Sequence, residues 1–121
     1  MRNTAITISA AIAVVLGSLS ISIPAVSQAG SSAIDEGKKI AFDRKKGNCL
    51  ACHQIEGGSL PGNIGPPLIA MKARFPDRAV LKEQISNPQK NNPNTMMPPF
   101  GPHEILSASE IDKVVDFIHT L

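Results

Sequence analysis

The end of the chain carries the clearest helical pattern, because apolar side chains recur there at intervals of three and four residues. Ser107 and Glu110 form the pattern of a capping box at the start of this helix. Leu106 and Ile111 stand on either side of that start, at the positions of a hydrophobic staple. The stripe expected to face the core consists of Ile111, Val114, Val115, Ile118 and Leu121.

Three further helices are predicted earlier in the chain. Residues 34–45 form the first, with Ser31 or Ser32 as its N-cap and with acidic residues near its start and basic residues near its end. Residues 68–75 form a short helix, and residues 76–86 form a better one with a proline in its first turn.

Two long segments between these helices are predicted to be loops. Residues 57–67, GGSLPGNIGPP, and residues 89–102, QKNNPNTMMPPFGP, are rich in Gly, Pro and Asn, which interrupt regular helices. No internal repeat, second domain boundary or convincing strand pattern accompanies them. We therefore expect one all-α domain with long structured loops.

Residues 1–29 are predicted to be a secretory signal peptide. Arg2 precedes an uncharged run over residues 5–23, and a proline and a small-residue triplet ending at Ala29 follow it. An uncleaved anchor is the alternative, because a run of about 18 or more apolar residues can span a bilayer. The residue directly after the cleavage point is Gly30 and not a cysteine, which argues against a bacterial lipid anchor. We expect a periplasmic protein whose mature chain, residues 30–121, has no membrane span.

The mature domain is small and nearly neutral. Without Arg2 it has eleven basic and ten acidic residues, a formal charge of +1, so charge does not indicate nucleic-acid binding. The chain has ten prolines and neither Trp nor Tyr. Because small domains often need a disulfide, a metal or a cofactor for stability, we expect a non-protein group to fill the core.

The only two cysteines of the chain stand in one short motif. Cys49 and Cys52 are three residues apart, and His53 follows directly, which is the C-x-x-C-H pattern of haem c attachment. Two thiols one turn apart can each add to a vinyl group on one porphyrin edge, and Nε2 of the histidine can then bind the iron. We therefore expect one covalent haem c, which would also supply the missing aromatic bulk.

Three other interpretations of the cysteine pair remain open. A dithiol motif or a simple disulfide suits an exported protein, although a thioredoxin-like motif needs a βαβ setting that this chain lacks. A zinc site would need more ligands at the right spacing, and His103 and His119 form no second cluster. Coincidence is the third interpretation.

A second axial ligand is expected from the second predicted loop. Met97 is preferred, because Pro98 and Pro99 restrict the backbone that follows it and a residue before proline is held extended. Met96 is a close rival, and one of the two must point away. His103 is a further alternative, although its setting favours an exposed loop. Met/His ligation would raise the reduction potential relative to a more strongly donating pair.

The segment 65–68, Gly-Pro-Pro-Leu, is a candidate support for the proximal ligand. A proximal histidine usually donates its other N–H to a backbone carbonyl, which fixes the ring. The carbonyl of Pro66 can be that acceptor, and Leu68 can pack on the porphyrin. A plain surface loop is the alternative. His119, near the end of the last helix, is assigned no function.

With these residues, the mature chain resembles class I c-type cytochromes, in which an N-terminal helix crosses a C-terminal helix beside the haem. The matching features are GKKI at residues 37–40, the CLACH pentad, Gly65-Pro66, the methionine loop and VVDFI at residues 114–118. Within that class it is most similar to SoxX, the monohaem subunit family of the SoxAX cytochromes of periplasmic thiosulfate oxidation. The segments that carry this resemblance are DRKKGN running into the pentad and Gln54, GNIGP at residues 62–66 and MPPFG at residues 97–101, and the extension before the pentad is the specific part.

The resemblance implies a heterodimer with a SoxA subunit, a dihaem or monohaem cytochrome on which thiosulfate is joined oxidatively to a cysteine of the SoxYZ carrier. The present chain would hold the electron-exit haem, with His53 and Met97 as axial ligands, and would pass electrons to an acceptor cytochrome c. It would then be a non-catalytic electron-transfer subunit of an L-cysteine S-thiosulfotransferase complex.

Outer-sphere electron transfer is therefore the predicted function. The alternative is a free soluble monohaem cytochrome c that shuttles electrons between periplasmic or membrane partners, for which the basic run at residues 44–46 would steer an acidic partner. A haem-free thiol switch or metal chaperone is a third interpretation. Stable co-purification with a larger haem protein would favour the subunit, and a monomer would favour the shuttle.

Overall fold

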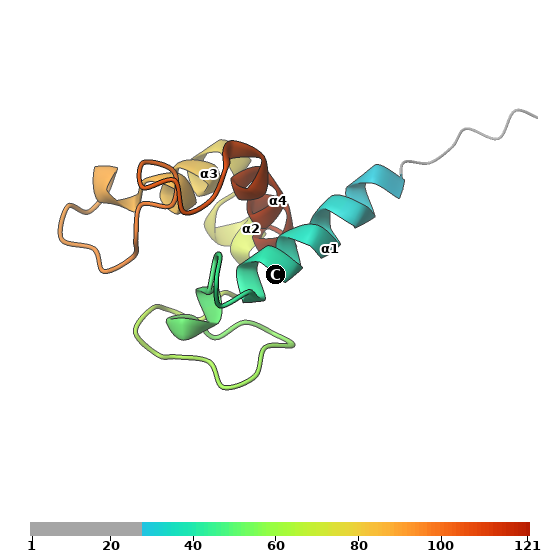
Figure 1. The fold of residues 1–121 in the computed structure, drawn as a ribbon, viewed down its shortest axis with the longest axis horizontal. Coiled ribbons are helices and arrows are strands. Elements are labelled where there is room, and N and C mark those ends of the chain that lie inside the picture. The colour runs from blue at the N-terminus through green and yellow to red at the C-terminus, as the bar shows by residue number, and fades with distance from the viewer. Residues whose placement is uncertain (1–27) are drawn as a thin grey trace, which may run out of the picture.

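The computed structural model of the protein describes residues 28–121 (Figure 1). Four α-helices and two single turns of 3-10 helix make up the regular structure of this part, which contains no strand. They are α1 (Gln28–Phe42), η1 (Cys49–Ala51), α2 (Met71–Arg74), α3 (Arg78–Ser86), η2 (Pro88–Lys90) and α4 (Ala108–Ile118). The predicted all-α fold is confirmed for these residues, whereas the predicted signal peptide lies outside them except for its last two positions.

Helices α1 and α4 cross in direct contact (Figure 1). A Cβ atom added to Gly37 would lie 1.9 Å from the backbone oxygen of Lys113 and 3.1 Å from Cβ of Phe117, so the approach requires a glycine. The rings of Phe42 and Phe117 meet edge to face, with their centroids 5.9 Å apart. The predicted crossing of an N-terminal and a C-terminal helix is therefore confirmed.

Helix α4 begins and packs as predicted. The backbone N–H of Glu110 donates to Oγ of Ser107 at 3.2 Å, and the backbone N–H of Ser107 donates to Oε2 of Glu110 at 3.0 Å. These two bonds complete the capping box. Leu106 is buried beside it. The predicted stripe faces the core, with Ile111, Val114, Val115 and Ile118 buried and Leu121 partly buried.

Helix α1 begins earlier than predicted. It starts at Gln28, so Ser31 and Ser32 lie within the helix, and the prediction that one of them is the N-cap is wrong. Neither serine has Glu or Gln three residues later, and a serine by itself is only mildly unfavourable inside a helix. A capping residue without its box therefore did not stop the helix from extending.

Helix α1 also ends at Phe42, three residues before the predicted end. The carboxylate of Asp43 accepts a 2.8 Å hydrogen bond from the backbone N–H of Lys45, which offers the chain a turn in place of the helix. The backbone N–H of Gly47 then donates to the carbonyl of Ile40 at 3.1 Å. This reversal leads the chain into the cysteine motif.

The two short helices begin later than predicted. Helix α2 is confined to Met71–Arg74, because Ala70 before it has a left-handed backbone with φ of 52°. Helix α3 starts after Asp77, whose carboxylate accepts a 2.7 Å hydrogen bond from the backbone two residues on. Pro76 therefore precedes the cap and does not lie in the first turn. Of the two predicted loops, residues 57–67 contain no helix, and residues 89–102 contain only the end of η2.

Candidate haem-binding site

The cysteine motif forms one tight turn. Asn48 enters it with a left-handed backbone, and the carbonyl of Cys49 then accepts hydrogen bonds from the backbone N–H groups of Cys52 and His53, at 3.2 and 2.9 Å. Both cysteines are free thiols and are partly buried. The turn therefore keeps the two sulfur atoms and the imidazole within one short, hydrogen-bonded stretch of backbone.

The first loop lies along this turn and is bonded to it at regular intervals. Two backbone N–H groups of the loop donate to carbonyls of the motif, Gly62 to Leu50 at 2.7 Å and Gly65 to Cys52 at 2.8 Å. Just beyond the two segments, Leu68 donates to the carbonyl of Gln54 at 2.9 Å. A Cβ atom at Gly62 would lie 2.0 Å from the backbone oxygen of Ala51, so the two segments are in backbone contact. The loop is thereby fixed against the motif.

His53 is oriented by this loop. Its Nδ1–H donates to the carbonyl of Pro66 at 2.7 Å, as expected for the proximal support. With Nδ1 engaged in this hydrogen bond, Nε2 is the ring nitrogen that is available to a metal. Gly65 lies against the ring, because a Cβ atom there would be 2.4 Å from Cε1 of His53. Arg74 donates to the carbonyl of Pro67 at 3.0 Å and ties α2 to the same loop.

The second loop directs its two methionines differently. Met97 is partly buried and packs against the core, whereas Met96 is 79% exposed. Phe100, three residues later, is buried. The backbone N–H of Gly101 donates to the carbonyl of Ser86 at 3.0 Å, which anchors the end of the loop to α3. Of the two rivals, Met97 is therefore the one that faces inward.

A cavity of about 680 Å³ lies between the two loops and the helices. The structure brings together at this cavity all the residues that the sequence singled out, which are Cys49, Cys52, His53, Pro66, Leu68 and Met97. Its volume is in the range of sites for small molecules and cofactors. His103, the other rival for the distal position, is exposed and does not border it.

Part of the cavity wall was not identified from the sequence. Five apolar residues that were not expected to contact a cofactor border the cavity, namely Met71, Phe75, Leu81, Val114 and Ile118, of which only Val114 and Ile118 were placed in the core-facing stripe. Their signal was present as helical periodicity, but periodicity does not distinguish a side chain that packs on protein from one that packs on a cofactor. These residues make the wall largely apolar.

The burial of Cys49 argues against a reactive dithiol. Burial raises the pKa of the Cys49 thiol to about 11, so this thiol stays protonated at neutral pH. A dithiol catalyst needs the opposite, a cysteine whose pKa is lowered. Across residues 28–121, no three His, Cys, Asp or Glu side chains lie close enough together to hold a metal ion.

The three basic residues before the motif, residues 44–46, differ in their contacts. Lys46 forms an ion pair with Glu110. Hydrogen bonds from Lys46 and from the backbone of Ser107 lower the pKa of the Glu110 carboxyl to about 2. Arg44 and Lys45 are exposed and border the cavity.

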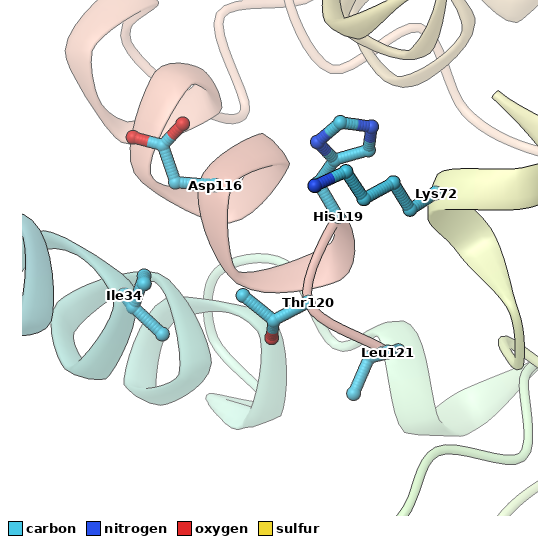
Figure 2. A pocket seen from close by; sticks show the side chains of 6 residues that line it. All are labelled: Ile34, Lys72, Asp116, His119, Thr120 and Leu121. Atoms are coloured by element: carbon cyan, nitrogen blue, oxygen red, sulfur yellow. The ribbon is translucent and has the colours of Figure 1, made fainter. Parts of the chain in front are cut away.

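A second hollow, of about 600 Å³, lies at the end of α4 (Figure 2). It is lined by Ile34, Lys72, Asp116, His119, Thr120 and Leu121. Figure 2 shows Lys72 extending toward His119, with Asp116 on the other side of the helix. Nε2 of His119 lies 2.9 Å from the carbonyl of Phe75, a contact that the sequence did not indicate. None of the predicted haem residues borders this hollow.

Comparison with known proteins agrees with this geometry. The Cytochrome c family model matches residues 34–121. A chain of the crystal structure of SoxXA from P. pantotrophus is 31% identical, with a TM-score of 0.64, over 71% of this chain and 79% of that chain.

A protein described as an uncharacterized lipoprotein of Aquifex aeolicus (strain VF5) is 38% identical over 76 residues, which are 62% of this chain. This chain spans only 37% of the length of that relative. Over residues 28–121, no helix has both the length and the apolar character needed to cross a membrane.

The family match covers the cysteine motif, both loops and α4. The chain therefore belongs to the cytochrome c family, as a SoxX-type class I cytochrome whose cofactor is haem c and whose role is electron transfer.

Proposed function

We propose that the chain is the electron-exit subunit of a SoxAX-type cytochrome that joins thiosulfate oxidatively to the cysteine of a SoxYZ carrier. The observation that carries the proposal is its similarity to SoxXA over most of the matched chain, at 31% identity. Residues 30–121 would form the mature domain, with one covalent haem c, and residues 1–29 would be a signal peptide that directs it to the periplasm.

The residues around the cavity fit a haem c. Cys49 and Cys52 would hold it through thioether bonds, and His53 and Met97 would be the axial ligands. The fit rests on three features of this chain, which are an imidazole whose Nε2 is left free by its bond to Pro66, a thioether on the inward side of the second loop, and a largely apolar cavity. When bound, haem c supplies an iron that gains and loses one electron.

The protein's contribution is to hold these donors still. The hydrogen bond to the carbonyl of Pro66 keeps the His53 ring in one orientation, and Leu68 is placed by its own bond to Gln54, the residue after the cysteine motif. Pro98 and Pro99 restrict the backbone after Met97. Because both ligand segments are fixed, little rearrangement is needed between the two oxidation states, and the apolar wall limits access of water.

The sulfur chemistry would take place on the partner, a SoxA-type subunit with one or two haems. Joining the carrier thiolate to thiosulfate forms one S–S bond and releases two electrons, which the present chain would carry onward to an acceptor cytochrome c. The chain would therefore be a non-catalytic subunit of the complex.

A free electron shuttle is the second candidate function. It is favoured by Arg44 and Lys45, two exposed cations that border the cavity and can steer an acidic partner. A shuttle would bind its partners weakly and in a salt-dependent way, whereas a subunit would form a stable 1:1 complex.

The experiment is to co-produce the full chain with the SoxA-type subunit of its own organism in cells that mature c-type cytochromes, and to measure the mass of the purified complex. A stable 1:1 complex with covalent haem on this chain is expected. A chain that stays monomeric at micromolar concentration would contradict the subunit proposal and favour the shuttle.

The ligand assignment is tested separately. Met97→Ala should keep the covalent haem but lose the methionine-ligated spectrum, with Met96→Ala as the matched control that keeps it. An unchanged spectrum in Met97→Ala would contradict the assignment and leave Met96 or His103 as the ligand.

A further inference from the structure

Leu60 is an exposed leucine in an unfavourable backbone conformation. Its φ is 53°, in the left-handed region that residues other than Gly, Asn and Asp rarely adopt. Its side chain is 88% exposed, so it gains little from packing in this chain. Neither local preference nor burial explains a leucine here, and backbone strain of this kind is characteristic of functional positions.

The frame around Leu60 is rigid. On one side, the backbone N–H of Gly58 donates to the carbonyl of Ile55 at 3.0 Å, and a Cβ atom at Gly58 would lie 2.3 Å from Cδ2 of Leu50. On the other side, Gly62 donates to the carbonyl of Leu50 at 2.7 Å. Figure 1 shows this loop at the lower margin of the domain, beyond η1. The leucine is therefore presented to solvent by a fixed turn.

A second apolar side chain on the same loop connects Leu60 to the haem cavity. Ile64 is 61% exposed and also borders the cavity, and its neighbour Gly65 contacts the His53 ring. Met96, from the second loop, is likewise exposed at this cavity. A protein that covered Leu60 and Ile64 would therefore reach the edge of the cavity.

The chemistry of the loop indicates what would cover it. Every residue from Gly57 to Met71 is uncharged, whereas residues 43–46 are all charged. The buried centre of a stable interface is depleted in charged residues, and contacts of weak, steered partners depend on charge. A loop whose own side chains are all uncharged thus fits a partner whose contact surface is apolar and uncharged.

We propose that Leu60 and Ile64 form the surface on which the partner haem subunit docks, with an apolar, uncharged face of that subunit covering them. This inference rests on the proposed function, since it names the contact surface of the same complex. Docking there would place the partner at the cavity edge and would make binding insensitive to salt.

The test compares variants of the full haem-loaded chain in binding to the SoxA-type subunit, at about 0.05 M and 0.5 M NaCl. Leu60→Asn replaces the leucine by a polar residue that tolerates the left-handed backbone, and Ile64→Ser removes the second apolar group. Each should weaken binding about tenfold and both together about a hundredfold, at both salt concentrations. The matched control is Arg44→Glu with Lys45→Glu, which should change binding less than about threefold.

Thermal unfolding separates docking from a structural role. Leu60→Asn should leave the melting temperature unchanged or raise it, because strain is relieved, while it weakens binding. If the double variant bound the partner subunit as tightly as the wild-type chain does, this inference would be overturned and the proposed function would stand. If the wild-type chain associated with itself and the double variant did not, the inference would be overturned, because the surface would then bind a second copy of this chain. No binding by the wild-type chain would overturn both.

Discussion

Replacement of Gly37 by alanine tests how closely the two terminal helices approach. The site lies within α1, where alanine is the better helix former and by itself would stabilise the protein by about 1 kcal/mol. The added Cβ atom, however, would lie 1.9 Å from the backbone oxygen of Lys113 in α4. The two effects have opposite signs, so the measured sign decides between them.

The clash is expected to be the larger effect. Carbon–oxygen contacts of this type normally lie at roughly 3.3 Å, so the helices must separate by more than about 1 Å. The neighbour is backbone and not the end of a flexible side chain, which puts the cost at about 3 kcal/mol, the upper end of usual overpacking costs. After the gain in helix propensity, Gly37→Ala should destabilise the protein by about 2 kcal/mol. For a domain of this size, that lowers the melting temperature by about 8–16 °C.

The assay is urea unfolding of the oxidised mature protein, followed by far-ultraviolet circular dichroism. Lys39→Ala is the matched control, because it introduces an alanine at an exposed position of the same helix and should change stability by less than about 0.5 kcal/mol. If Gly37→Ala were as stable as the wild type or more so, helix propensity would have won and the close approach described above would be wrong.

Three further outcomes are expected. Gly65→Ala should displace the His53 ring, because the new Cβ atom would lie 2.4 Å from Cε1, and the NMR signal of Nδ1–H should exchange faster; an unchanged signal would contradict this contact. Hydrogen bonds from Lys46 and from the Ser107 backbone lower the pKa of Glu110 from 4.5 to about 2, so its stabilising effect is complete above pH 4.5 and is lost as the pH falls through about 2. Glu110→Gln should flatten the acid side of the stability curve, by at most about 1 kcal/mol because the pair is solvent-exposed, and a curve that matches the wild type would count against this account. His119→Ala should cost about 1 kcal/mol by removing the contact of Nε2 with the Phe75 carbonyl, measured as a urea midpoint, and an unchanged midpoint would show the contact to be unimportant.

Features set by neighbouring residues were predictable. The capping box of Ser107 and Glu110 is local, and so the start of α4 was predicted correctly. The spacing of the cysteine pair indicated haem c, which the family match supports. Local signals also failed where they were incomplete, because Ser31 and Ser32 had no capping box and did not mark the start of α1.

Contacts between distant segments were predicted only in part. The carbonyl of Pro66 was expected as a partner for His53 because a proximal histidine needs an acceptor, but its distance of 2.7 Å depends on the three backbone bonds that hold the first loop in place. Val114 was placed in the stripe that faces the core, although it also borders the cavity, and Phe75 was not expected at the cavity at all.

The sequence by itself determined the helical periodicity, the cap of α4 and the cysteine–histidine motif at residues 49–53, because each depends on side chains that are close together in the chain. Only the tertiary structure decided that Met97 faces inward while Met96 faces solvent, that Gly37 is where α1 and α4 meet, and that Leu60 is left uncovered. These outcomes depend on which side chains are buried and which stay exposed once all the helices and loops have packed. Contacts between residues far apart in the chain decide this.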